Sequence, residues 1–189
     1  MKAILTALAV LATTLVTGSC NKDEDSGDVD LENQPRIDDS VYEAIENQPR
    51  IDDPVLGARV VGEFGASRFF GGSVRTHEGR DYDCVAGIHE VRAVLPGTII
   101  KSGIGQTTSA KRAGIMVEIS HSEGGEICAT RYMHLGSALP KVGDKVKAND
   151  VIGTCATSVP EQKKPTGHIH FEVIGALGQR LDPRSFMER

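Results

Sequence analysis

The 189-residue chain has room for one ordinary domain and a tail, which excludes two full-sized domains. A hydrophobic fraction of 39% is ordinary for a globular protein and is enough to form a core without help from disulfides. The 21 glycines and the modest helix-forming runs favour a turn-rich fold dominated by strands over a helical one.

Residues 1–19 have the composition of a secretory signal peptide. Lys2 supplies a positive charge, residues 4–16 form an apolar run too short for a permanent transmembrane helix, and residues 17–19 are small. The next residue, Cys20, resembles the lipidated cysteine that ends the lipobox of bacterial lipoproteins. We therefore expect residues 1–19 to be removed and Cys20 to carry a lipid anchor, with simple cleavage and release as the alternative.

Residues 20–56 are expected to form an acidic, disordered tether. Between residues 21 and 53 there are 12 acidic and three basic residues, whereas residues 54–189 carry a net charge of +3. Such a segment buries too little apolar surface to offset the entropy of ordering. The sequence ENQPRIDD occurs twice in it, at 32–39 and 46–53. We interpret the repeat as a duplicated piece of spacer; a propeptide-like strand lying in the active-site groove is the alternative.

Two histidines in GHIHFEVI, residues 167–174, form the first element of a candidate site. The apolar, β-branched and aromatic residues around them predict a strand. Residues two apart on a strand project from the same face, so His168 and His170 should lie side by side. Two imidazoles on one rigid face suit a zinc ligand and a neighbouring catalytic base.

A second element is HEGRD, residues 77–81. On a straight strand His77 and Asp81 would lie about 13 Å apart, too far to share an ion. Gly79 lies between them and permits a bend that would bring imidazole and carboxylate together. His77, Asp81 and one histidine of the pair then make the three protein ligands that catalytic zinc sites use.

A third element is RYMHL, residues 131–135, where Thr130, Tyr132 and His134 alternate with their neighbours as in a strand. His134 is expected to reach the same site without binding the metal. His121, which follows the strand predicted over residues 115–119, and His89 are expected to have no role in the site. Cys84, Cys128 and Cys155 allow one intrachain disulfide, whose pairing the sequence leaves open.

HEGRD, YMHL and GHIHFE resemble, in this order, the motifs H-x-G-x-D, Y-x-H-L and G-x-H-x-H-F-E of the lysostaphin/LytM-type zinc endopeptidases. The resemblance covers roughly residues 57–186. It implies a mainly β, antiparallel, sandwich-like domain with little helix over residues 57–189. It also implies that His77, Asp81 and His170 bind Zn²⁺ and that His134 and His168 are the catalytic histidines, in an order that stays open.

Two loops depart from the family pattern, at residues 105–114 and 155–167, and both are expected to border the groove. No tyrosine precedes His77 where some members place a transition-state donor; Phe69 and Phe70 lie there instead.

The family resemblance implies hydrolysis of peptide cross-links in peptidoglycan, with the D-Ala–diaminopimelate bond as the expected target. We expect a monomer in the cell envelope, anchored to the outer membrane through lipid and facing the periplasm or the cell surface, with peptidoglycan stem peptides as partners and no nucleic acid. Three alternatives stay open: a non-catalytic regulator of amidases, a peptidase for a glycine-rich protein outside the wall, and a structural wall-binding module.

Overall fold

The computed structural model describes residues 50–70, 72–104, 113–156 and 167–187. The expected signal peptide, Cys20 and most of the acidic segment therefore lie outside the described residues. Within the described ranges no helix is long and apolar enough to cross a membrane.

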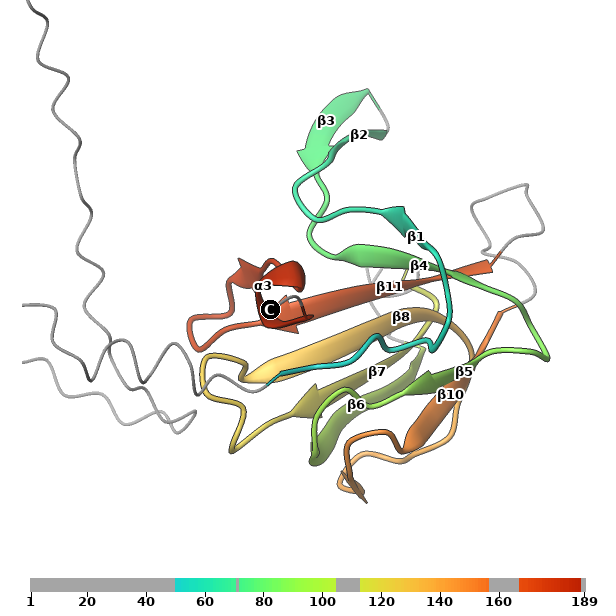
Figure 1. The fold of residues 1–189 in the computed structure, drawn as a ribbon, viewed down its shortest axis with the longest axis vertical. Helices are drawn as coiled ribbons and strands as arrows, with labels where there is room; N and C mark the ends of the chain where they lie inside the picture. The colour runs from blue at the N-terminus through green and yellow to red at the C-terminus, as the bar shows by residue number, and fades with distance from the viewer. Residues whose placement is uncertain (1–49, 71, 105–112, 157–166, 188–189) are drawn as a thin grey trace, which may run out of the picture.

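One large antiparallel sheet forms the body of the domain (Figure 1). Its main path runs β1-β4-β11-β8-β7-β6-β9, while β10 joins β8 to β5 and β12 extends β11. Two further strands, β2 and β3, form a separate hairpin that projects from the body. The strands are β1 (Val60–Gly62), β2 (Ser67–Phe70), β3 (Ser73–Thr76), β4 (Arg80–Cys84), β5 (Glu90–Arg92), β6 (Gly97–Ile104), β7 (Ile115–Ser120), β8 (Ala129–Ala138), β9 (Lys145–Val146), β10 (Val151–Cys155), β11 (Gly167–Ile174) and β12 (Arg180–Leu181).

The expected antiparallel β fold with little helix is confirmed. In the described residues the only helix is the four-residue α3 (Arg184–Met187). The strands expected around residues 115–119, 130–135 and 167–174 are present as β7, β8 and β11.

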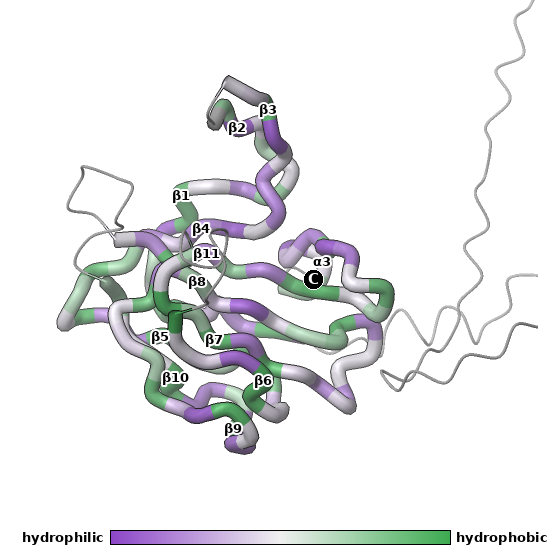
Figure 2. Tube along the Cα trace, turned by 180° about the vertical axis from the view of Figure 1, so that it is seen from behind, coloured by the Kyte–Doolittle hydropathy of each residue, from purple (hydrophilic) through white to green (hydrophobic). Residues whose placement is uncertain are grey.

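The core lies on one face of the central strands. Along β11, Ile169, Phe171 and Val173 are fully buried, as strand alternation requires. The ring of Phe171 packs against Tyr132 on β8 at 5.2 Å between centroids and against Tyr82 on β4 at 6.5 Å. Seen from behind, hydrophobic and hydrophilic stretches alternate along these strands (Figure 2). The opposite face is therefore free to carry polar side chains.

The packed part of the chain begins before residue 57. Ile51 and Val55, 2% and 0% exposed, belong to the core cluster, and Ile51 N donates to the carbonyl of Phe186 in α3. The end of the segment that we interpret as a tether, including the last residues of the second ENQPRIDD copy, thus packs on the domain. The charged neighbours Asp52 and Asp53 are exposed, which explains why composition alone groups these residues with the tail.

A disulfide joins Cys84 at the end of β4 to Cys155 at the end of β10, with Cα atoms 5.6 Å apart. Cys84 and Cys155 are two of the three cysteines whose pairing the sequence leaves open. The two strands belong to different parts of the sheet, and 71 residues separate the cysteines, so the bond closes a long loop.

Replacing both cysteines by alanine should lower the free energy of unfolding by about 2–4 kcal/mol, because the unfolded chain regains the entropy of that loop. Urea unfolding monitored by circular dichroism measures the change. Cys84→Ala alone and Cys155→Ala alone are the matched controls, and each should lose nearly as much as the pair. An unchanged urea midpoint in all three variants would contradict a stabilising crosslink.

Candidate metal centre

A bend between β3 and β4 brings the first two candidate ligands together. His77 lies just after β3 and Asp81 is the second residue of β4, and His77 Nε2 is 3.1 Å from Asp81 Oδ1. Gly79 lies in the bend, as the sequence predicts, but its φ is not positive. A Cβ at Gly79 would clash with the carbonyl oxygen of Phe171. The glycine is needed because the bend presses directly against β11.

Strand β11 carries the third candidate ligand. In the antiparallel pairing with β4, His170 lies opposite Asp81 and His168 lies opposite Asp83. His168, His170 and Glu172 share the face opposite the core residues of this strand. The same-face geometry that the H-x-H spacing predicts is therefore present.

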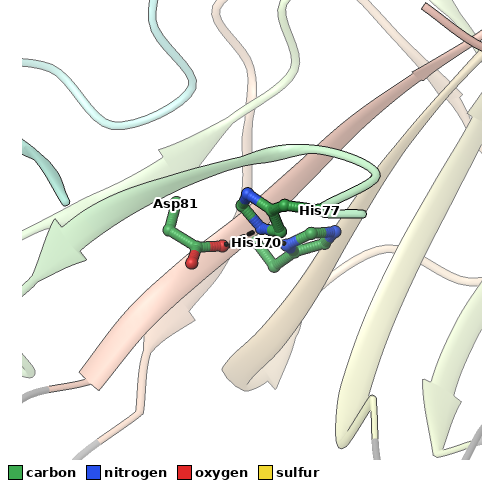
Figure 3. A group of neighbouring side chains, drawn as sticks. All are labelled: His77, Asp81 and His170. Carbon is green, nitrogen blue, oxygen red and sulfur yellow. Dashed lines mark hydrogen bonds and ion pairs between the residues drawn. The ribbon is translucent and has the colours of Figure 1, made fainter. Parts of the chain in front are cut away.

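The side chains of His77, Asp81 and His170 converge on one point (Figure 3). His170 Nδ1 lies 2.8 Å from Asp81 Oδ1 and 2.9 Å from His77 Nε2. Ligand atoms about 2.1 Å from a tetrahedral zinc ion would lie roughly 3.4 Å from one another. A small outward movement of the three side chains would therefore admit the ion, and two nitrogens with one carboxylate oxygen are a donor set that zinc accepts.

Hydrogen bonds behind the two histidines fix which ring nitrogen faces the cluster. His77 Nδ1 donates to the main-chain carbonyl of Glu63 at 2.7 Å, which leaves Nε2 to act as a ligand. His170 Nε2 lies 3.3 Å from Glu172 Oε1 and can donate to it, which leaves Nδ1 to act as a ligand. An imidazole whose second nitrogen is held by an oxygen acceptor is a better oriented and more basic ligand.

Arg68 holds the carboxylate of Asp81. Its guanidinium donates to Asp81 Oδ2 at 2.5 Å, so that only Oδ1 faces the histidines. A Cβ at Gly62 would clash with the Arg68 guanidinium, so this glycine makes room for the contact. Arg68 belongs to β2, which ties the base of the projecting hairpin to the site.

A row of alternating charges continues from Glu172 across the sheet. Glu172 is 3% exposed; its Oε2 accepts from Arg131 Nη1 at 2.9 Å and pairs with Arg180 Nε at 2.8 Å. Arg131 also donates to Glu118, which Lys101 contacts from the other side. The buried carboxylate behind His170 is therefore held in place by cations on both flanking strands, β8 and β12.

His134 reaches the site through an irregularity in β8. Between Tyr132 and Leu135 the pairing with β7 shifts by one residue, and His134 has a φ of 64°, a region that non-glycine residues rarely occupy. Strict alternation would place His134 on the core face with Tyr132. The bulge puts Leu135 in the core instead and turns His134 toward His168, with ring centroids 4.9 Å apart.

His134 Nδ1 is buried and has no hydrogen-bond partner among the described residues. Its ring centroid lies 6.3 Å from that of His170. A buried polar atom without a partner costs stability, and beside a candidate metal site it is suited to contact a substrate or water.

The histidines of the site differ in their electrostatic environment. Burial, followed by the positive charges of His168 and His170, lowers the pKa of His134 to about 4. Burial also lowers the pKa of His168. For His170 burial acts in the same direction, but hydrogen bonds to Asp81 and Glu172 outweigh it and raise the pKa to about 9. The pair next to the ligands is thus neutral near pH 7, as a proton acceptor must be.

Two contacts of the site were not predicted from the sequence. Glu172 lies two residues after His170, so the alternation of β11 alone could have placed it on the ligand face. Arg68 gives no such signal, because its contact with Asp81 depends on the bend of the β3–β4 connection. The expected borders of the groove at 105–114 and 155–167 fall almost wholly outside the described residues.

The other two histidines lie away from the ligands. His121 is 1% exposed and bonded to Thr130 and to the carbonyl of Pro96, a satisfied position in the core. His89 accepts a hydrogen bond from the main-chain nitrogen of Val85.

Replacing Glu172 by glutamine should raise the dissociation constant for zinc by roughly 10–100-fold, because His170 then faces a neutral amide oxygen in place of the charged acceptor that orients and polarises it. Competition against a chromophoric chelator measures this constant on the metal-free protein. Glu118→Gln is the matched control, since Glu118 contacts Arg131 but no ligand. Equal zinc affinities for the two variants would show that the carboxylate does not support the site.

Zinc affinity should increase with pH up to about 9 and then level off, because His170 is protonated below that pH and must lose its proton to bind metal. At neutral pH, zinc binding should release protons, which calorimetric titration in two buffers of different protonation enthalpy detects. A dissociation constant that stays the same from neutral pH to pH 9 would contradict this assignment of the His170 proton.

Comparisons with known proteins indicate the family of this chain. Residues 75–183 match the model of Peptidase family M23, a range that contains all five histidine and aspartate positions of the site. Stage II sporulation protein Q of Bacillus subtilis is 31% identical over 112 residues, which are 59% of this chain and 34% of that protein.

Two solved structures share the fold. The catalytic domain of the antimicrobial peptidase lysostaphin from Staphylococcus simulans is 24% identical with a TM-score of 0.56, covering 70% of this chain and 93% of that one. A zinc containing peptidase from Vibrio cholerae is 22% identical with a TM-score of 0.54, covering 72% of this chain and 38% of that one. Since the family model matches more than half of its residues, this chain belongs to Peptidase family M23.

Proposed function

We propose that this protein is a zinc-dependent endopeptidase that hydrolyses peptide cross-links of peptidoglycan. The observation that carries the proposal is the convergence of five side chains: His77, Asp81 and His170 as candidate ligands, with His134 and His168 beside them. Each ligand presents one lone-pair atom to the same point, and two neutral imidazoles adjoin that point. This is the arrangement that metal-assisted peptide hydrolysis requires.

In the proposed mechanism His77, Asp81 and His170 would hold a zinc ion, which would supply Lewis acidity for attack of water on the peptide carbonyl. One histidine of the His134–His168 pair accepts the proton of the attacking water and passes it to the leaving amine. The other donates an N–H to the carbonyl oxygen as negative charge develops there. The lowered pKa values of both rings keep the proton acceptor neutral at physiological pH.

The proposed substrate is the D-Ala–diaminopimelate cross-link in the wall of a cell with an outer membrane. Residues 54–189 carry a net charge of +3, which favours an anionic polymer such as peptidoglycan. The lysostaphin likeness is to a peptidase described as antimicrobial, which is consistent with action on bacterial walls. We further propose that Cys20 is lipidated and that the acidic segment spans the distance between an outer-membrane anchor and the wall.

Stage II sporulation protein Q, which is similar to this chain, forms a pore forming complex with SpoIIIAH in a solved structure. This similarity supports a second candidate, a binding or regulatory protein without hydrolytic activity. The two candidates differ in what they require of His134. A binding role does not need a neutral imidazole with an unpartnered nitrogen at this position, whereas a hydrolase does.

Digestion of purified sacculi by the zinc-loaded chain from residue 21 onward tests the proposal, with released muropeptides identified by mass spectrometry. The chain must include Ile51, which is part of the core. The wild type should convert cross-linked dimers into monomers with new amine ends. His134→Ala and His168→Ala should lower the rate by roughly 100-fold or more while keeping one zinc per chain.

His89→Gln is the matched control, since this histidine lies away from the ligands, and it should digest sacculi like the wild type. Zinc binding without any release by the wild type would refute the hydrolase and favour the binding role. Cleavage of glycine-rich peptides without cleavage of sacculi would show that the substrate is a glycine-rich protein outside the wall.

A further inference from the structure

The residues just before β1 are docked on the domain by three small apolar contacts. Ile51 and Val55 are buried in the core cluster, and the partly buried Ala58 packs against it. The backbone is also held: Ile51 N donates to Phe186 O at 3.1 Å, and Arg92 N donates to the carbonyl of the residue before Val55 at 2.9 Å. The docked segment, residues 50–58, is thus recognised through an Ile-x3-Val-x2-Ala pattern and main-chain groups.

The same pattern occurs a second time upstream, in the stretch that begins with the first copy of ENQPRIDD. Residues 32–44 and 46–58 are identical at 10 of 13 positions. The identity extends beyond ENQPRIDD to the residues that the docking uses, because Ile37, Val41 and Ala44 correspond to Ile51, Val55 and Ala58.

The three differing positions are compatible with the same docking surface. Leu56 is 57% exposed, so the tyrosine that replaces it upstream would face solvent. Pro54 contributes its carbonyl oxygen, which the upstream serine also has. Gly57 has a φ of 73°, and a Cβ there would contact nothing within 4 Å. The upstream glutamate at this position would fit in space but would adopt a strained backbone.

We propose that residues 36–44 can replace residues 50–58 on the docking surface of the same chain. In the intact protein the downstream copy is favoured, because it avoids the strained glutamate and needs no extra loop before β1. The upstream copy docks when the downstream copy is displaced or damaged. The surface therefore has two alternative occupants, offset by the spacing between the two copies of ENQPRIDD.

The exchange would change the reach of the domain. Docking of the upstream copy shortens the chain between Cys20 and the domain by that spacing and loops out residues 45–58 before β1. If Cys20 is the anchor, as proposed above, the domain would then lie closer to the membrane. The exchange itself does not depend on lipidation or on peptidase activity.

Thermal unfolding of the full chain tests the exchange. Ile37→Asp alone should leave Tm unchanged, because the downstream copy holds the surface. Ile51→Asp should lower Tm moderately, since the upstream copy takes over. The double variant should unfold lower than Ile51→Asp by roughly 5 °C or more, because neither copy can then bury an isoleucine. The matched control carries Ile51→Asp with residues 32–45 scrambled at constant composition, and it should behave like the double variant.

Hydrogen exchange gives a second, direct readout. Peptides covering residues 37–44 should become protected in the Ile51→Asp protein and not in the wild type. Should Ile51→Asp fail to fold, Ile51→Ala replaces it in all comparisons. The same Tm for Ile51→Asp and the double variant, without protection of residues 37–44, would overturn the proposal. If residues 37–44 become protected and sedimentation shows a dimer, the upstream copy docks on a second chain. That result would overturn docking within one chain.

Discussion

The antiparallel register between β4 and β11 is the constraint on which the site depends. It places His170 directly opposite Asp81 while Ile169 and Phe171 point into the core on the other face. A slip of one residue would exchange the two faces, moving the histidines into the apolar core and Ile169 and Phe171 onto the polar face. Such a slip would break up the apolar packing, so the core also holds the ligands in register. Stability and site geometry are therefore fixed by the same pairing.

That register places two carboxylates, Asp81 and Glu172, in positions that are almost inaccessible to water. Burial raises the pKa of each, but in both cases hydrogen bonds and nearby positive charges prevail and lower it. The positive charge of Arg68 compensates the negative charge of Asp81. The charges of Arg131 and Arg180 compensate that of Glu172. Since a buried ion pair contributes little net stability, the pairs are better explained by the fixed positions they give to the ligands than by folding energy.

What the sequence predicted correctly depends on local patterns. The alternation in GHIHFEVI and the break at Gly79 are visible within a few residues, and both features are present. Two other features depend on residues distant in the sequence, and the sequence analysis did not predict them. Ile51 is flanked by charged residues and becomes part of the core because Phe186 of α3 holds it, while Arg92 of β5 holds the nearby Pro54. The contact of Arg68 with Asp81 likewise needs the folded hairpin.

His134 lies beside His168, as the sequence analysis expects, but it reaches that position through a departure from regular strand alternation. Alternation groups it with Tyr132, yet a bulge and a positive φ turn it to the opposite face. The strained backbone costs roughly 1–2 kcal/mol, and the buried Nδ1 without a described partner adds to this cost. A leucine or valine in regular β structure would avoid both costs and still complete the sheet. Strain that brings an imidazole beside His168 is better explained by chemistry at the site than by folding, which favours the hydrolase over the binding role.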